Sequence, residues 1–347
     1  MSGSLLTTNG MFIIDEIHTS GQSYSDIIGG GGMYAILGGC IVSPSVEIKK
    51  KLRWIVDRGR DFPMDITKQI ESWNTGVCFR DDQSRLTTRG WNFYGENEFR
   101  EFKYLSKKKR IDVEDWRNEF GSEEVDHLAC VHLVCSDERA SSIIDEMRSY
   151  AKCEDRVYVW EPIPDLCDAQ HFDGIKAVMN RHEKVILSPN AEEGARLFGI
   201  SEPTTLEECE NLAKRFDSFM GPENICVLRC GKLGSVALTA RRKESRDLIH
   251  FPAYHFETPQ KVIDPTGGGN TFLGGFSVGY VLTRGNVSIA SICGNISAGC
   301  AIEQIGVPKL NHEKWNGLSF EERLGIYIET YKLPYDRETI NKMLLDY

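Results

Sequence analysis

Short apolar runs alternate along the chain with longer segments in which apolar residues recur every three or four positions. The apolar runs predict buried strands at residues 11–17, 52–56, 128–135, 156–162, 184–190 and 224–231. The periodic segments predict helices, among them residues 141–151, 172–181, 191–198 and 205–216. Strands that alternate with helices predict an α/β fold with a mostly parallel sheet, covered by helices on both faces.

Residues 75–94 have a different pattern. TGVCFRDD and TTRGWNFYG mix polar and apolar residues on either side of a turn, which predicts a hairpin. Beside an α/β core, this hairpin is either a small β lid or an edge hairpin with no function. Residues 309–347 predict a helical extension that packs on the core, with helices at 321–331 and 337–345. No linker interrupts the chain, so we expect one domain over residues 1–347.

Composition narrows the function classes. With 347 residues, 41% of them hydrophobic, the chain can bury a large core. We expect a cytoplasmic protein with no membrane partner, because no apolar run reaches the roughly 18 residues of a span and the N-terminus lacks a signal-peptide pattern. The eleven cysteines lack metal-site spacing. A net charge of −10 argues against nucleic-acid binding, and Lys107-Lys108-Lys109-Arg110 is either a solvated loop or a nuclear-import signal.

The stretch IDPTGGGNTFLGG carries the strongest chemical signal. It follows a short predicted strand at residues 261–263 and opens an apolar helix. Gly267, Gly268 and Gly269 therefore lie at a helix N-terminus, where free N–H groups and the helix dipole attract an anion such as phosphate. A glycine turn that only packs is the alternative. The stretch lacks the lysine of a P-loop, and residues 27–39 fail the GxGxxG dinucleotide pattern.

DPTGGGNTFLGG resembles the C-terminal signature of the ribokinase-like (PfkB) carbohydrate kinases. The resemblance implies a ribokinase-like three-layer fold with a small β lid, an anion hole made by the three glycines, and ATP with Mg²⁺ as cofactors. The family places its catalytic aspartate at the position of Asn270. An asparagine there is also a feature of the fungal maintenance-of-killer branch of the family, which this sequence resembles. Members often form homodimers through the lid, so we expect a dimer of this kind as well.

Other segments extend the resemblance over roughly residues 11–307. SPNAEE is similar to the family's Asn-x-x-Glu motif, which implies that Asn190 and Glu193 lie near Mg²⁺ and the nucleotide phosphates. By the same resemblance Gly231, Gly234 and Asn295 flank the nucleotide. The expected acceptor ligands are Asp15 and the glycine run Gly29, Gly30, Gly31 and Gly32. Glu161 stands where the family often has an aspartate.

Asn270 decides between the function hypotheses. A neutral amide cannot accept the proton of a sugar hydroxyl, and general-base catalysis contributes about 10²–10⁴ in rate. The first hypothesis is a slow ATP-dependent kinase of a sugar-like small alcohol, because positioning and charge stabilisation carry most of phosphoryl transfer. In that case Asp264 is the nearest alternative base in the sequence, although we favour for it the role of orienting the loop. The second is a pseudokinase that binds nucleotide or sugar and acts through protein partners, and the third a purely structural protein.

Overall fold

A seven-stranded sheet forms the centre of the computed structural model, which describes residues 3–19, 21–94, 100–150, 153 and 155–346. Its strands lie in the order β1 (Leu6–Thr8), β8 (Cys130–Cys135), β9 (Val157–Pro162), β10 (Lys184–Leu187), β11 (Ile225–Arg229), β12 (Ser235–Leu238) and β13 (Leu248–Phe251). The first five strands are parallel, and β12 and β13 are antiparallel to their neighbours. The predicted mostly parallel sheet is confirmed.

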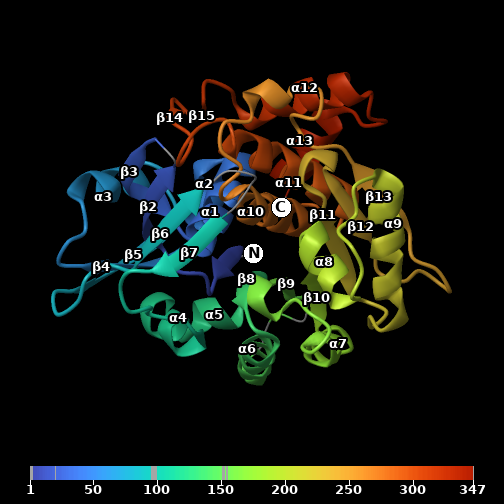
Figure 1. Cartoon of the computed structure of the whole chain (residues 1–347), viewed down its shortest axis with the longest axis horizontal. Helices are drawn as coiled ribbons and strands as arrows, with labels where there is room; N and C mark the ends of the chain where they lie inside the picture. Colours follow the sequence, from blue (N-terminus) through green and yellow to red (C-terminus); the bar gives the residue numbers. More distant parts are fainter. Residues whose placement is uncertain (1–2, 20, 95–99, 151–152, 154, 347) are drawn as a thin grey trace.

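Helices cover both faces of this sheet (Figure 1). The helices of the described chain are α1 (Gly31–Val42), α2 (Val46–Lys50), α3 (Met64–Glu71), α4 (Val113–Phe120), α5 (Ser122–Asp126), α6 (Asp137–Ser149), α7 (Phe172–Met179), α8 (Ala191–Leu197), α9 (Leu206–Arg215), α10 (Gly268–Leu282), α11 (Val287–Ala301), α12 (Phe320–Tyr331) and α13 (Arg337–Leu345). Alternate side chains of β9 enter two separate cores. Val157 and Val159 pack on the side of α1, α10 and α11, and Tyr158 and Trp160 on the side of α6 and α7. The three-layer α/β fold is therefore confirmed.

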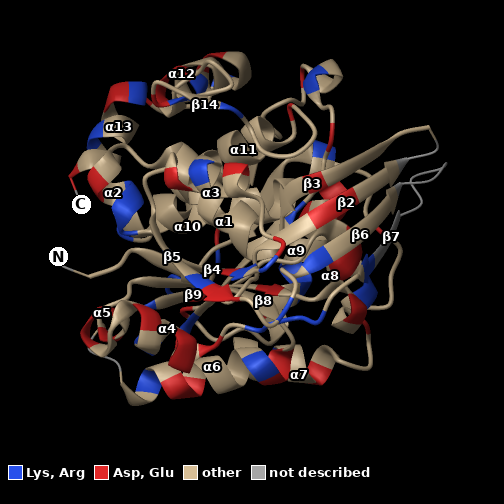
Figure 2. Cartoon of the chain, turned by 90° about the vertical axis from the view of Figure 1, so that its left-hand side faces the viewer, with Lys and Arg blue, Asp and Glu red and all other residues tan. Residues whose placement is uncertain are grey.

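A second sheet of four strands, β3 (Ser23–Gly29), β2 (Ile13–Thr19), β6 (Arg89–Tyr94) and β7 (Arg100–Tyr104), projects from one side of this core (Figure 2). The hairpin predicted within residues 75–94 is wrong. Its first half, β5 (Gly76–Asp82), pairs in parallel with β4 (Arg53–Gly59), whereas its second half pairs with β2 and β7. Each half pairs with a different strand, because burial across the whole fold decides which strands pair, and closeness in sequence does not.

Three further strand predictions need correction. Residues 11–17 and 52–56 do form strands, but β2 and β4 lie outside the central sheet. The central sheet begins instead with β1, a strand of three residues that carries little periodic signal. Residues 261–263 are not a strand, since a 3₁₀ turn at Pro259–Lys261 leads into an exposed loop. The predicted C-terminal helices are present as α12 and α13, and they pack on each other and on α11 and α10.

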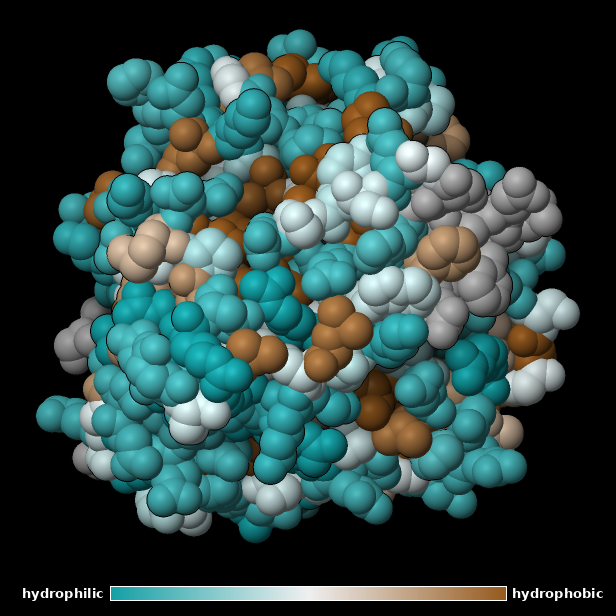
Figure 3. Space-filling view, turned by 60° about the vertical axis from the view of Figure 1, so that its left-hand side comes forward, coloured by the Kyte–Doolittle hydropathy of each residue, from teal (hydrophilic) through white to brown (hydrophobic). Residues whose placement is uncertain are grey.

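The face in Figure 3 is largely hydrophilic, with apolar side chains gathered near its centre. Among the described residues, no helix is both long and apolar enough to cross a membrane.

Candidate active site

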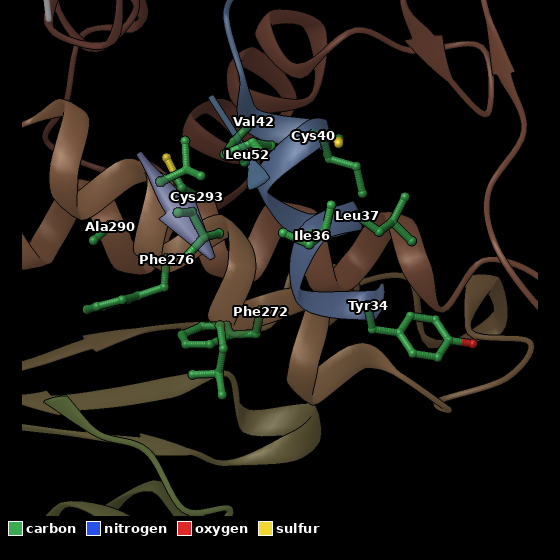
Figure 4. Close-up of a cluster of buried hydrophobic side chains, with 14 of the residues drawn as sticks. Tyr34, Ile36, Leu37, Cys40, Val42, Leu52, Phe272, Phe276, Ala290 and Cys293 are labelled. Carbon is green, nitrogen blue, oxygen red and sulfur yellow. The ribbon is translucent and has the colours of Figure 1, made fainter. Parts of the chain in front are cut away.

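Helices α1 and α10 run side by side in the same direction. Gly31 lies beside Asn270 at their N-terminal ends, and Gly39 lies beside Val278 two turns later. The contact is close because glycine replaces larger residues, and a Cβ atom on Gly274 would overlap the carbonyl oxygen of Ala35. Figure 4 shows apolar side chains of both helices, among them Leu37 and Phe276, in the core beneath. The two positive helix ends therefore point to the same place.

The glycine turn before α10 forms the predicted helix N-terminus. Gly267 has φ 77°, a left-handed conformation that favours glycine, and Tyr34 lies against it without room for a side chain. The N–H of Gly268 donates to the Pro265 carbonyl, whereas in the described part of the chain the N–H groups of Gly269 and Asn270 have no backbone partner. Asp264 accepts a hydrogen bond from the Thr266 N–H at 2.9 Å, an interaction that suits a residue orienting the turn.

Asn270 follows this turn directly. Its Oδ1 atom is buried, has no hydrogen-bond partner among the described residues, and would lie 2.9 Å from a Cβ atom on Gly31. A buried amide oxygen without a donor is costly, which favours a ligand that donates to it. Asn270 thus stands between the glycine turn and the start of α1.

A cavity of about 490 Å³ opens on one side of this point. Its lining includes Gly268 and Gly269 at one end and Gly231, Gly234 and Asn295 further along. Asn295 is held in place, because its Nδ2 donates to the Ser235 hydroxyl and to the Ser291 carbonyl. The structure therefore brings together most of the residues predicted to bind a nucleotide. We call this space the nucleotide cavity.

Asn190 and Glu193 lie behind the nucleotide cavity. Asn190 caps α8, and the two residues form a reciprocal capping box. The Glu193 carboxylate is 3.4 Å from Arg229 Nη2, and the Glu161 carboxylate lies 2.7 Å from the same nitrogen. Burial alone would lower the pKa of Arg229, but the two carboxylates raise it, so the guanidinium stays charged. Burial raises the pKa of Glu193, and Arg229 counteracts this shift.

These residues do not fit a Mg²⁺ ion. Mg²⁺ requires an octahedral set of oxygen ligands at about 2.0–2.1 Å, and a guanidinium already occupies the space between Glu161 and Glu193. No cluster of three or more His, Cys, Asp or Glu side chains suited to a metal occurs in the described ranges. The role of Glu193 at a metal stays a prediction that this arrangement disfavours.

A second cavity, of about 620 Å³, reaches Gly31, the residue beside Asn270. Gly31, Asn9 and Ile13 line it, whereas Asp15, two residues beyond Ile13 on the same face of β2, is not part of the lining. Burial raises the pKa of Asp15 to about 6, and a hydrogen bond with Asn92 offsets part of the shift. Asp15 Oδ1 and Asn9 Nδ2 are buried and have no partner in the described chain. We call this space the acceptor cavity.

Most glycines in the run around Gly31 lie where a larger side chain would not fit. Gly30 has φ 99°, is the N-cap residue of α1 and lies close to the Met11 carbonyl. The remaining glycines are equally constrained, since Gly29 lies against the Asp15 carboxylate and Gly32 against Gly10. Gly31 is the member of the run that lines the acceptor cavity.

Sequence reasoning missed the charged lining of both cavities. Lys108 and Arg110, read from the sequence as part of a solvated or import segment, line the acceptor cavity together with Arg139. None of these three cations has a carboxylate within ion-pair distance among the described residues. Arg229 was missed as well, although an arginine that ends the apolar run NICVL is unusual enough to have raised the question.

Comparison with solved structures identifies the fold. The chain is similar to the ribokinase of Giardia lamblia, with a TM-score of 0.68, 13% identity and coverage of 95% of this chain and 100% of that one. It is also similar to an adenosine kinase of Anopheles gambiae, with a TM-score of 0.67, 14% identity and coverage of 89% and 100%. At these identities the likeness concerns the fold, which is ribokinase-like.

Sequence relatives are much closer. The chain is 51% identical to Protein MAK32 of Saccharomyces cerevisiae, over 98% of this chain and 96% of that protein. It is 31% identical to an uncharacterized protein of Schizosaccharomyces pombe, over 93% and 92% of the two chains. Residues 72–313 match the pfkB family of carbohydrate kinases. The chain therefore belongs to the pfkB family, in its fungal maintenance-of-killer branch.

Proposed function

We propose that the protein binds ATP in the nucleotide cavity and a small hydroxyl-bearing molecule in the acceptor cavity, and that it transfers the terminal phosphoryl group slowly. The observation that supports this most directly is the position of Asn270, where the glycine turn and the acceptor cavity meet. The ends of α1 and α10 supply N–H groups and dipoles for the charge that develops in transfer. The predicted Mg²⁺ would have to be held by the phosphates themselves.

The acceptor carries negative charge on this proposal. Lys108, Arg110 and Arg139 place three cations around the acceptor cavity, against the single carboxylate of Glu138 in its lining. No carboxylate of the described residues pairs with them, although the chain has a net charge of −10, which favours a phosphorylated or carboxylated sugar-like molecule over a neutral sugar. The free acceptor atom of Asp15 then suits a hydroxyl group of the same molecule.

The second candidate is a nucleotide-binding protein without turnover, which acts through protein partners. It is favoured by the neutral side chain at position 270, because no carboxylate of the described residues stands in its place beside Gly31. Homodimerisation through the four-stranded sheet and a cytoplasmic or nuclear location stay predictions under both candidates.

One experiment separates the candidates. ATP binding is measured by calorimetry, and ADP release is measured with neutral and anionic sugars, for the wild type, Asn270→Asp and Asn270→Ala. If transfer is only slowed, Asn270→Asp releases ADP about 10²–10⁴ times faster than the wild type with an anionic acceptor, and Asn270→Ala does not.

ATP binding without turnover in either the wild type or Asn270→Asp would support the second candidate. Absence of ATP binding would contradict both.

A further inference from the structure

Arg229 lies between the carboxylates of Glu161 and Glu193. Its side chain is 10% exposed, and the side chains of Glu161 and Glu193 are 9% and 5% exposed. The three groups form a buried ion cluster at the end of β11, directly behind the glycine turn. Two carboxylates and one guanidinium leave one negative charge, so the cluster is already close to balance without a metal.

The guanidinium also has a donor to spare. Nη2 makes all the contacts with Glu161, Glu193 and the Ser188 carbonyl. Nη1 lies against Gly269 and has no hydrogen-bond partner in the described part of the chain. Arg229 and Gly269 both line the nucleotide cavity, and Nη1 lies beside Gly269 there.

We infer that Arg229 replaces the metal ion, so that the phosphate end of a nucleotide binds between Nη1 and the glycine turn without Mg²⁺. The identity of the ligand rests on the function proposed above. A guanidinium is always charged and forms strong, directional hydrogen bonds with phosphate oxygens. Glu161 and Glu193 hold it in one orientation, which makes it a fixed cation behind the glycine turn.

The wild-type protein gives the first test. ATP binding is measured by calorimetry on the full chain, once in EDTA and once in excess MgCl₂. We expect dissociation constants that differ by less than about threefold. Binding that strengthens more than about tenfold with Mg²⁺ would overturn the inference and leave the proposed function standing. Failure to bind ATP in either buffer would overturn both.

A pair of variants gives the second test. Arg229→Gln removes the cation, and we expect its ATP affinity in EDTA to fall about tenfold or more, and MgCl₂ to restore part of it through the freed carboxylates. Arg80→Gln is the matched control, since Arg80 likewise pairs with two carboxylates, Asp57 and Asp115, but lines neither cavity. It should bind ATP as the wild type does.

Unchanged affinity of folded Arg229→Gln in EDTA would contradict the role of Arg229. If Arg229→Gln does not fold, the wild-type comparison decides alone.

Discussion

Arg229 of the nucleotide cavity and the cations of the acceptor cavity differ in how they are held. In the nucleotide cavity, Arg229 is buried and paired with Glu161 and Glu193. In the acceptor cavity, Lys108 and Arg110 are exposed and no carboxylate of the described residues pairs with them. A buried pair is fixed and costly to disturb, whereas an exposed cation is free to follow its ligand. On the proposed function, the first arrangement would preorganise the phosphate site, and the second would attract an anionic acceptor and select for it.

The largest effect should come from breaking the buried pair. Arg229→Gln leaves two carboxylates uncompensated, so we expect the free energy of unfolding to fall by about 3–5 kcal/mol. Urea denaturation measures the loss, and the double variant Arg229→Gln with Glu161→Gln should recover part of it. Arg80→Gln should lose less unfolding free energy, because Asp57 keeps Lys109 as a partner. The side chains of Arg80 and its two carboxylates are also more exposed than those of the Arg229 cluster. An equal loss of unfolding free energy in Arg229→Gln and Arg80→Gln would show that the Arg229 cluster is no more costly to disturb than that of Arg80.

Replacing Asp15, near the acceptor cavity, should have an effect of intermediate size on stability. Its folded pKa of about 6 lies above the ordinary 3.8, so the folded state binds a proton more tightly than the unfolded state. Stability should therefore fall as the pH rises from about 4 to about 6, and Asp15→Asn should remove that dependence and gain up to about 3 kcal/mol at pH 7. Urea denaturation across this pH range measures both. If the stability of the wild type did not change with pH over this range, burial would not destabilise the charged form of Asp15.

The exposed cations should give the smallest effect. Lys108→Glu and Arg110→Glu each place a negative charge beside the acceptor, and we expect each to weaken binding of an anionic sugar by about tenfold at low salt, with little change in stability. Calorimetric titration with an anionic acceptor and its neutral parent measures the contrast. Lys50→Glu, on α2 and outside both cavities, is the control. Equal loss for the neutral compound would argue against charge selection.

The sequence predicts much of the core but little of its pairing. The strands around residues 128–135 and 184–190 and the helices after them were predictable, because their periodicity reflects burial at each position. The glycine turn was predictable because Gly267 adopts a positive φ that few other residues tolerate. Strands β5 and β6 could not be placed, since each pairs with a segment far away in sequence.

The candidate site shows the same limit. Asn270 and the nucleotide residues followed from motifs, whereas Arg229 emerged as a site residue when β11 brought it beside Glu161 from β9 and Glu193 from α8. In the sequence, Lys108 and Arg110 belong to an ordinary basic run, and only the fold shows that they line a cavity. Charge balance across a site depends on three-dimensional neighbours that no single stretch of sequence contains.

The parallel course of α1 and α10 has a consequence for the life of the protein in the cell. The positive ends of two aligned helices repel each other when no anion lies between them. A phosphate bound at this place would therefore stabilise the folded protein. A ligand present at 100 times its dissociation constant adds about 2.7 kcal/mol to the stability of the form that binds it. The amount of folded protein would then follow the supply of nucleotide, whether or not a phosphoryl group is ever transferred.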